Sequence, residues 1–303
     1  MIASEFYKNI IVLVTGGAGF IGSHIVEDLV DLGAKVRVID NLSSGFSQNL
    51  EHIKNKIEFI VGDITDAKTV LQVTKDCKVI FHLAAFVSAP DSVNKPHECY
   101  STNIEGTKNL LAAAAKNNVE RFVFSSSSAV YGTKDQPCTE SMPCQPESPY
   151  GFSKFMGELW CKEYSQTFGL KTVCLRYFNV HGSRQNPEGG YAAVVAKFKS
   201  LMAQNKPVTI FGDGKQTRDY IPVESVANAN VTLAMMPKHL MAGDTYNIGT
   251  GKSIDLIELV GLLKKDFPKY TAQINFEPAR QGDIKNSSAD ISKYNGALEL
   301  LNK

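Results

Sequence analysis

The sequence predicts an α/β protein with a doubly wound parallel sheet of the Rossmann type, joined to a smaller α/β domain. Three observations support this fold class. The apolar run Ile10–Val14 reads as a buried parallel strand and is followed by a glycine-rich loop and a helical pattern. A second strand pattern, Lys35–Asp40, ends in an acid. Strand patterns then alternate with helical ones up to about residue 180.

The loop after the first strand has the glycine spacing of a dinucleotide site. Gly17, Gly19 and Gly22 give G-x-G-x-x-G, and Gly16, Gly19 and Gly22 also give G-x-x-G-x-x-G. One glycine permits the tight turn, one lets the backbone approach a pyrophosphate, and one lets the helix pack on the strand. The helix amino terminus then offers free N–H groups to the phosphates. The alternative is a glycine-rich turn in another kind of α/β protein.

Asp40 ends the second strand, where a carboxylate would meet the ribose 2′-hydroxyl, and this favours NAD over NADP. The polar loop Asn41–Gly45 follows where the adenosine would lie. Ile57–Val61 reads as a third strand and is followed by Asp63. Asp63 could accept a hydrogen bond from the adenine amino group, and a helix amino-terminal cap at Asp63 is equally consistent with this position.

Later strands should bring further polar groups to the same edge of the sheet. Val79–Leu83 reads as a fourth strand, and the small residues Ala84–Ala85 at its carboxyl end leave room for a cofactor. After a helix at Asn103–Asn117, the fifth strand Arg121–Ser128 ends in four serines that we expect to face the ligand. Thr172–Tyr177 reads as a sixth strand.

The order of elements becomes less regular from about Val180, so we expect a dinucleotide-binding domain over residues 1–180 and a second, mainly substrate-binding domain over 181–303. Some segments of the second domain should return to the first. Tyr191–Asn205 is predicted to be a helix, and Val208–Phe211 a short strand. The helix should turn four apolar residues inward, namely Val194, Val195, Phe198 and Leu201.

Composition excludes several classes of partner. Hydrophobic residues make up 43% and charged residues 21% of the 303 residues, which is ordinary for a soluble globular protein. The formal net charge of +1 does not favour nucleic acid, and no apolar run is long enough for a membrane helix. The first eight residues do not resemble a secretory signal. The six cysteines have neither C-x-x-C nor metal-ligand spacing, so we expect no metal and a cytoplasmic protein.

Tyr150 and Lys154 open a predicted helix that runs to about Phe168 and is stopped by Gly169. Their spacing of four places both side chains on one helical face. A cationic lysine close to a phenol favours the phenolate and lowers a pKa that is about 10 when unperturbed. Downstream of a dinucleotide loop and a serine-tipped strand, this pair predicts a tyrosine general base.

These motifs together resemble the extended short-chain dehydrogenase/reductase family. The first half supplies Gly16-x-x-Gly19-x-x-Gly22, Asp40, the serines of Phe124–Gly132, and Tyr150-x-x-x-Lys154. The second half is similar to the nucleotide-sugar epimerase/dehydratase branch in Leu175–Val180, Arg184–Pro187, Phe211–Gly214, Arg218–Tyr220 and Tyr246–Gly249. The resemblance covers nearly the whole chain and implies an NAD-dependent enzyme that acts on a nucleotide sugar.

The residues after Ser127 favour 4-epimerisation within this branch. Dehydratase relatives carry an Asp-Glu pair here and decarboxylase relatives often a Glu, whereas this chain has Ser127, Ser128 and Ala129. The resemblance then implies that Tyr150 removes the proton from the sugar O4 while hydride passes from C4 to NAD. The 4-keto sugar turns over and takes the hydride back on its opposite face. Ser127 would bind O4 and relay the proton, and Lys154 would also hold the nicotinamide ribose.

The resemblance assigns further contacts residue by residue. Those to NAD fall on Gly16, Gly19, Phe20, Ile21, Gly22, Asp40, Asn41, Ser43, Ser44, Gly45, Asp63, Ile64, Leu83, Ala84, Ala85, Asn103, Ser125, Tyr150, Lys154, Tyr177 and Val180. Those to a UDP-sugar fall on Val87, Ser88, Ser126, Ser127, Tyr150, Asn179, Ala193, Val194, Ile210, Arg218, Arg280, Asp283 and Ser287. Arg218 and Arg280 would clamp phosphates. Taken singly, Arg218 with Asp219 could instead be a surface ion pair, and Asn179 a turn former.

Substrate choice and assembly are also implied by the resemblance. Ser287 takes the place of a tyrosine that closes the sugar pocket of some relatives to an acetamido group, so the small serine predicts an open pocket. Relatives pair through helices that correspond to Asn103–Asn117 and Tyr150–Phe168, which implies a homodimer. Two alternatives stay open, an epimerase or oxidoreductase for GDP- or dTDP-sugars, and a non-catalytic NAD-sensing regulator on the same fold.

Overall fold

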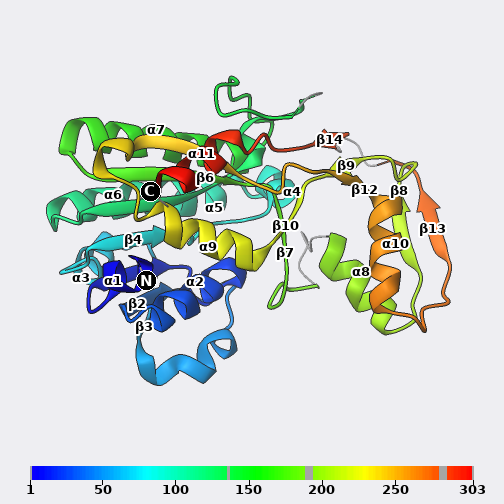
Figure 1. The fold of residues 1–303 in the computed structure, drawn as a ribbon, viewed down its shortest axis with the longest axis horizontal. Helices are drawn as coiled ribbons and strands as arrows, with labels where there is room; N and C mark the ends of the chain where they lie inside the picture. The colour runs from blue at the N-terminus through cyan, green and yellow to red at the C-terminus, as the bar shows by residue number, and fades with distance from the viewer. Residues whose placement is uncertain (1, 135–136, 188–193, 280–284, 302–303) are drawn as a thin grey trace.

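The computed structural model describes residues 2–134, 137–187, 194–279 and 285–301 of the chain. Its centre is a parallel sheet of seven strands in the order β11-β6-β5-β4-β1-β2-β3 (Figure 1). The strands are β1 (Ile11–Thr15), β2 (Lys35–Asp40), β3 (Ile57–Val61), β4 (Val79–His82), β5 (Arg121–Ser127), β6 (Lys171–Tyr177) and β11 (Ala242–Ile248). The order reverses between β1 and β4, which is where ligands of such sheets bind. The α/β parallel-sheet prediction is confirmed.

All six strands predicted before residue 180 are present, each within about one residue of its predicted ends. The seventh, β11, was not predicted as part of this sheet. It comes late in the chain and pairs with β6, with Tyr246 opposite Leu175 and Ile248 opposite Tyr177. Short-range periodicity does not reveal a strand that joins a sheet formed mostly by residues more than sixty positions earlier.

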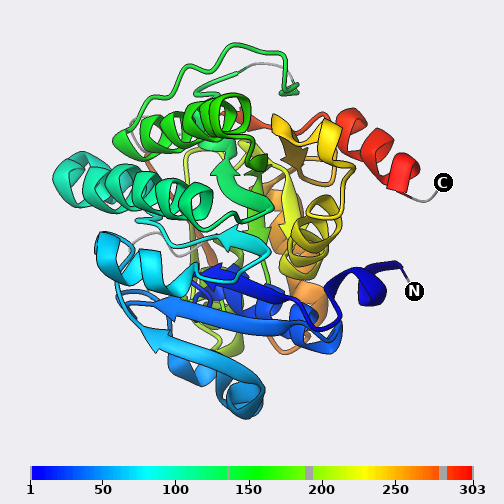
Figure 2. The same cartoon turned by 90° about the vertical axis from the view of Figure 1, so that its left-hand side faces the viewer.

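Helices cover both faces of the large sheet because its strands are apolar on both sides. Val12 and Val14 point into one buried cluster, together with residues of α2 (Phe20–Asp31) and α9 (Val223–Leu233). Leu13 points into the other, which includes residues of α3 (Ala67–Val73), α6 (Gly106–Lys116) and α7 (Pro149–Phe168). Figure 2 shows α6 and α7 side by side on that second face.

The helix predicted at Asn103–Asn117 begins earlier than expected. The segments α4 (Ala89–Asn94) and α5 (Pro96–Tyr100) precede a π-helical turn at Ser101–Glu105, which runs directly into α6. Such turns inside helices occur often at functional sites. The predicted helix at Tyr150–Phe168 is confirmed as α7, and Gly169 ends it at φ 74°, the left-handed conformation that suits glycine.

A second group of elements packs around its own apolar cluster, which includes Val195, Phe198, Ile210 and Leu259. It contains α8 (Val194–Ala203), α10 (Leu256–Asp266) and the paired strands β8 (Val208–Phe211) and β13 (Ile274–Glu277). Figure 1 shows this group to one side of the large sheet. The first three residues of the helix predicted at Tyr191–Asn205 lie outside the described residues.

Short strands lie between the two groups of elements (Figure 1). They are β7 (Asn179–His181), β9 (Thr217–Arg218), β10 (Tyr220–Pro222), β12 (Ile254–Asp255) and β14 (Asn286–Ser287). β10 pairs with β7, and β9 lies between β12 and β14. Because α9 packs on the large sheet and β11 belongs to it, the chain passes between the two groups more than once. The domain boundary at residue 180 stays a prediction.

The remaining elements close the ends of the fold. They are α1 (Ile2–Tyr7), α11 (Ser292–Leu301), and short 3-10 segments at Ser47–Lys56, Ser128–Val130 and Lys238–Leu240. Tyr7 is fully buried and donates a hydrogen bond to the Val231 carbonyl at 2.7 Å, which ties α1 to α9. Within the described residues, no helix is both long and apolar enough to cross a membrane.

Candidate active site

The glycine loop joins β1 to α2 at the reversal point of the sheet. Gly16 has φ 68°, and a Cβ atom there would lie 2.6 Å from the Ala84 nitrogen. A Cβ atom on Gly22 would lie 2.2 Å from the Gly16 carbonyl oxygen. Side chains at either position would therefore push the loop away from β4 or the helix away from the loop. These close contacts explain why the loop requires glycine at both positions.

The amino terminus of α2 fits a phosphate group. Gly19 is the residue before the helix, and no side chain caps the helix there. A Cβ atom on Gly19 would meet only the Gly16 carbonyl oxygen, at 3.1 Å, so the other side of the loop is open. The first N–H groups of a helix attract an anion when no side chain satisfies them. Phe20 and Ile21, predicted as cofactor contacts, form the first turn of this helix.

Asp40 is held rigidly at the end of β2. Its two carboxylate oxygens accept hydrogen bonds from the Ala18 nitrogen at 2.9 Å and the Leu42 nitrogen at 2.8 Å. Burial raises the pKa of the Asp40 carboxyl, and these two backbone bonds partly offset that effect. A Cβ atom on Gly45 would lie 3.0 Å from an Asp40 oxygen, so the loop passes close by. A fixed carboxylate here suits a free ribose hydroxyl and repels a 2′-phosphate.

Asp63 does not cap a helix. It accepts hydrogen bonds from the Thr65 nitrogen at 2.8 Å and the Asn41 side chain at 2.8 Å. Although burial opposes it, these bonds hold the pKa of Asp63 below its usual value. Asp66 caps α3 instead, through the Lys68 nitrogen, so the capping alternative for Asp63 is wrong. Its contact with adenine stays a prediction, as do those of the exposed Ser43 and Ser44 and of the buried Ile64.

The exit of β4 is fixed by a histidine that sequence reasoning missed. The Thr15 hydroxyl accepts hydrogen bonds from the Leu83 and Ala84 nitrogens at 3.2 and 3.1 Å, and lies 2.8 Å from His82 Nδ1. His82 Nε2 lies 2.8 Å from the Thr107 hydroxyl. Burial, together with the Lys154 charge, lowers the pKa of His82 to about 3. The neutral ring thus holds the Thr15 hydroxyl, which in turn fixes the backbone at Leu83 and Ala84. It takes no part in acid–base chemistry near neutral pH.

Tyr150 and Lys154 lie in the first two turns of α7. The Ser148 hydroxyl caps this helix by accepting a hydrogen bond from the Gly151 nitrogen at 3.1 Å, and the Tyr150 nitrogen donates to the Ser92 hydroxyl at 3.1 Å. Lys154 Nζ donates to the Ser125 carbonyl at 2.8 Å and lies 5.9 Å from the centroid of the Tyr150 ring. The structure therefore places the cation beside the phenol, as predicted.

Lys154 has little access to solvent. Burial lowers the pKa of its ammonium group to about 8. The group is still mainly cationic at neutral pH. A positive charge in so dry a place acts strongly on a neighbouring oxygen, because little water screens it.

The serines at the end of β5 divide between two faces of the strand. The Ser125 hydroxyl bonds to the Tyr177 hydroxyl at 2.9 Å, and Tyr177 donates to Asn230 at 2.7 Å. Ser127 is half-buried, and its hydroxyl accepts a hydrogen bond from the Ala129 nitrogen at 3.2 Å. Ser127 thus stays at the carboxyl edge of the sheet, whereas the Tyr177 hydroxyl is used inside the protein.

Ser126 points the other way because successive side chains of a strand alternate. Its hydroxyl donates to Glu158 of α7 at 2.5 Å, and Glu158 forms a buried ion pair with Arg176 of β6 at 2.7 Å. The expected substrate contact of the Ser126 side chain is therefore wrong. The glutamate, which sequence reasoning missed, lies four residues after Lys154, and that helical spacing could have revealed it.

Asn103 lies in the π-helical turn and connects the cofactor loop to α7. Its side-chain oxygen accepts a hydrogen bond from the Phe86 nitrogen at 2.7 Å, and its amide nitrogen donates to the Phe86 carbonyl and the Ser153 hydroxyl at 3.0 and 2.9 Å. Asn103 is buried, so its side chain serves to hold the backbone at Phe86; its contact with NAD stays a prediction.

The expected substrate residues fall into three groups. Asn179, Arg218 and Ser287 come together on short strands, with Ser287 opposite Arg218 in the β14–β9 pair and the Asn179 nitrogen bonded to the Asp219 carbonyl at 3.0 Å. Val87 is 55% exposed, and Ser88 caps α4. Val194 begins α8. Val180, which was expected to contact NAD rather than the substrate, lies beside Asn179 in β7.

Two further expectations about the substrate side are corrected. The side chain of Ile210 is 1% exposed inside the apolar cluster of the smaller group, so it cannot line a sugar pocket. Asp219 is fully buried and bonds to backbone N–H groups, so a surface ion pair with Arg218 is wrong. Ala193, Arg280 and Asp283 lie outside the described residues.

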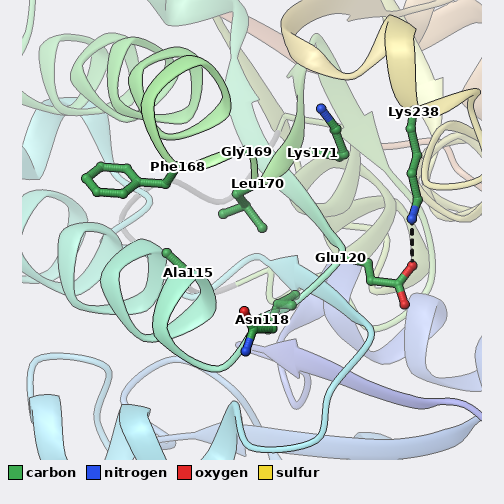
Figure 3. Close-up of a pocket in the computed structure, with 9 residues that line it drawn as sticks. Ala115, Asn118, Glu120, Phe168, Gly169, Leu170, Lys171 and Lys238 are labelled. Carbon is green, nitrogen blue, oxygen red and sulfur yellow. Dashed lines mark hydrogen bonds and ion pairs between the residues drawn. The ribbon is translucent and has the colours of Figure 1, made fainter.

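A hollow of about 250 Å³ lies at the opposite edge of the sheet (Figure 3). It is lined by the ends of α6 and α7 and the starts of β5 and β6, where Lys238 pairs with Glu120 at 2.9 Å. None of the predicted site residues lines it. Because all seven strands are parallel, this edge is the one that ligands of such sheets do not use.

A glycine loop at the reversal point, an acid at the end of β2 and a Tyr-x-x-x-Lys pair on α7 define a dinucleotide-dependent enzyme of the short-chain dehydrogenase/reductase type. The family comparison narrows this class. The chain belongs to the NAD dependent epimerase/dehydratase family, whose model matches residues 12–249.

Known proteins resemble the chain over almost its whole length. A "putative UDP-glucose 4-epimerase" of Methanocaldococcus jannaschii is 39% identical, over 93% of this chain and 90% of the relative. The solved UDP-N-acetylglucosamine 4-epimerase of Methanobrevibacter ruminantium, in complex with UDP-N-acetylmuramic acid, is 40% identical with a TM-score of 0.90, over 95% and 91% of the two chains. The UDP-glucose 4-epimerase of Thermotoga maritima, solved with UDP-glucose, is 37% identical with a TM-score of 0.90, over 96% and 93%.

Proposed function

We propose that this chain is an NAD-dependent UDP-hexose 4-epimerase. The observation that carries the proposal is the buried Lys154 ammonium beside the Tyr150 ring, in a chain with no carboxylate directly after Ser127. The first feature supports proton removal from a sugar hydroxyl, and the second leaves elimination and decarboxylation without the acid that such relatives use. The relatives named UDP-glucose and UDP-N-acetylglucosamine 4-epimerase support the substrate class.

Each residue of this pair has a distinct role. The Tyr150 phenolate accepts the proton of the sugar O4 as the 4-keto sugar forms, and gives it back when the keto group is reduced. The Lys154 charge stabilises the phenolate through space. Lys154 keeps its position because the Ser125 carbonyl accepts one of its hydrogen bonds at 2.8 Å. Ser127, at the end of the same strand, binds O4 and passes the proton between oxygen atoms.

The residues of the glycine loop would hold NAD, with Asp40 at the adenosine ribose and the start of α2 at the pyrophosphate. When bound, NAD supplies the hydride acceptor and donor at C4 of the sugar. Because the hydride returns to the opposite face of C4, both faces of the sugar would have to meet the bound cofactor in turn, so the sugar has to rotate while its UDP part stays in place. The chain therefore needs firm nucleotide contacts, and we assign them to Asn179, Arg218, Arg280 and Asp283.

The decisive test is an NMR assay of the purified protein with UDP-glucose and, separately, UDP-N-acetylglucosamine. We expect the anomeric signal of the corresponding galacto epimer to appear in both reactions without added reductant. GDP-mannose and dTDP-glucose serve as matched controls. Turnover of either control in place of the UDP-sugars would contradict the proposed substrate class, and retention of NAD without any turnover would indicate a regulator.

Ser287 should set which UDP-sugars are accepted. It lies half-buried on β14, beside Arg218 of β9. We expect Ser287→Tyr to lower kcat/KM for UDP-N-acetylglucosamine by about tenfold or more and to leave UDP-glucose within about threefold. The reason is that a ring takes the space of an acetamido group, and a steric mismatch of this kind is worth about 1–3 kcal/mol. Ser287→Ala, which keeps the space, should behave as the parent; equal losses for both sugars in Ser287→Tyr would show that this residue is not the gate.

We also propose a cytosolic homodimer. All six cysteines are free, which suits a reducing compartment. Along α7, Phe152 and Leu159 are 46% and 45% exposed, although both are large and apolar, and α6 lies beside α7. Two such helix pairs from two chains would cover these side chains. Sedimentation should give a mass near two chains at micromolar concentration, and Leu159→Lys should lower it to one; a single-chain mass for the parent protein would contradict the dimer.

A further inference from the structure

Asp219 has an unusual position for an acidic side chain. It follows β9, where strands β9, β12 and β14 lie between the large sheet and the group that contains α8 and α10 (Figure 1). Its side chain is fully buried. None of its partners among the described residues is a cation, although a buried carboxylate normally needs a strong compensating interaction.

Four hydrogen bonds compensate for that burial, and they come from two separate segments. One carboxylate oxygen accepts the Thr250 nitrogen at 2.8 Å and the Thr250 hydroxyl at 2.7 Å. The other accepts the Gly251 nitrogen at 3.0 Å and the Ala289 nitrogen at 3.2 Å. An ionised carboxylate is an acceptor only, so it matches a set of four donors.

Each of these segments leads to a different part of the candidate site. Thr250 and Gly251 follow β11, the last strand of the large sheet. Ala289 lies two residues after Ser287, at the end of the segment that carries β14. The backbone of Asp219 adds a third connection, because its carbonyl accepts the Asn179 nitrogen at 3.0 Å and the Asn179 side-chain nitrogen at 3.3 Å.

The Asp219 carboxylate is closely packed against Gly249 and Ala289. A Cβ atom on Gly249 would lie 2.8 Å from an Asp219 oxygen and 2.8 Å from the Ala289 side chain. The side of the junction that faces Gly249 is therefore tightly packed, and a side chain at position 249 would displace the Asp219 carboxylate or Ala289. A change of the Asp219 side chain alters its bonds to two segments, that of Thr250 and Gly251 and that of Ala289.

We infer that Asp219 is a positioning residue for the UDP-sugar, because its carbonyl holds Asn179 beside Arg218, the two expected contacts of the nucleotide half, and its carboxylate ties them to the segment that carries Ser287. This inference rests on the proposed function, since it takes those three positions as part of a UDP-sugar site. Asp219 touches neither the sugar nor the proton acceptor. Tyr150 and Lys154 are held by other contacts, through Ser92, Ser148 and the Ser125 carbonyl.

The test is Asp219→Asn in the NAD-loaded protein. An asparagine presents one acceptor oxygen and one NH₂ group, so the NH₂ group faces N–H donors and at least one of the two segments bonded to the side chain moves. We expect the dissociation constant of UDP, measured by calorimetry, and the KM for UDP-glucose to rise at least about tenfold, as for the loss of hydrogen bonds to a charged group. The value of kcat at saturation should stay within about threefold of the parent, and bound NAD should be unchanged.

Asp255→Asn is the matched control. Asp255 lies in the same region and also accepts a backbone N–H, that of Glu258 at 2.7 Å, but it caps α10 on the surface. Asparagine caps a helix as well as aspartate does, so UDP binding should be that of the parent. A defect that only destabilises the fold lowers the melting temperature of Asp219→Asn while the folded protein binds UDP normally, and that result would overturn the inference.

Substitutions at Thr250 test the same inference if the Asp219→Asn variant does not fold. Thr250→Val removes the hydroxyl, which donates to the carboxylate at 2.7 Å and also accepts the Lys252 nitrogen at 3.2 Å, whereas Thr250→Ser keeps the hydroxyl. We expect the valine variant to bind UDP about three- to tenfold more weakly and the serine variant to bind within about twofold of the parent. Equal UDP affinity in all variants overturns the inference alone. Failure of the parent protein to bind UDP overturns the proposed function together with it.

Discussion

Tyr150→Phe should lower kcat for UDP-glucose by about 10²- to 10⁴-fold, the range that a positioned general base contributes. The variant removes one oxygen atom and keeps the ring. The backbone nitrogen of residue 150 can still donate its hydrogen bond to the Ser92 hydroxyl. Among the described residues near Lys154, we identify Tyr150 as the base for O4 and expect no other residue to replace it. The measurement is the initial rate of epimerisation by NMR, together with the NAD released when the purified protein is denatured.

Tyr164→Phe provides the control for this prediction. Tyr164 lies ten residues after Lys154 on the same helix. Its ring packs against that of Phe168, with the two ring centroids 4.7 Å apart. Its loss should leave the rate within about twofold. Bound NAD and the melting temperature of Tyr150→Phe should equal those of the parent. If Tyr150→Phe kept more than about a tenth of the parent rate, another group would have to be the base.

Lys154→Met should have the second largest effect, with a fall in kcat of about 10²- to 10³-fold at pH 7. Methionine keeps the length of the side chain but loses both the charge and the hydrogen bond to the Ser125 carbonyl. Without the cation, the Tyr150 phenolate forms only near the ordinary tyrosine pKa of about 10. The variant should therefore regain part of its activity as the pH rises from 7 to 10.

In the parent protein, the rate of epimerisation should instead fall as the pH rises into the alkaline range. Burial lowers the pKa of Lys154 to about 8, so the ammonium is charged below that pH and loses its proton above it. The rate should therefore decline as the pH rises past about 8, whereas Lys154→Arg should keep its charge through that range. Lys162→Met, an exposed lysine on the same helix, should follow the parent profile. An identical pH profile for the parent and Lys154→Met would exclude this role for the cation.

The first half of the site could be predicted because its chemistry is carried by local patterns. The glycine loop, Asp40 and the Tyr150–Lys154 pair each lie within one turn, strand end or helix, and short-range periodicity places them correctly. The contacts of Ser126, Ile210 and Tyr177 could not be predicted in the same way. Their side chains bond or pack across segments that are distant in sequence, and the residue type alone does not say on which face a polar or apolar group lies.

By itself, the sequence determined the fold class, the six early strands, the glycine loop after β1 and the placement of Tyr150 and Lys154 on one face of a helix. Each of these depends on the spacing of neighbouring residues along one element, which the chain carries locally. Only the tertiary structure decided that β11 returns to the large sheet, that His82 is neutral and that Glu158 joins Ser126 to Arg176. It alone placed Asp219 at the junction of three segments. Such features depend on burial and on long-range contacts, because the cost of an unpaired buried polar group is set by the residues that surround it in space.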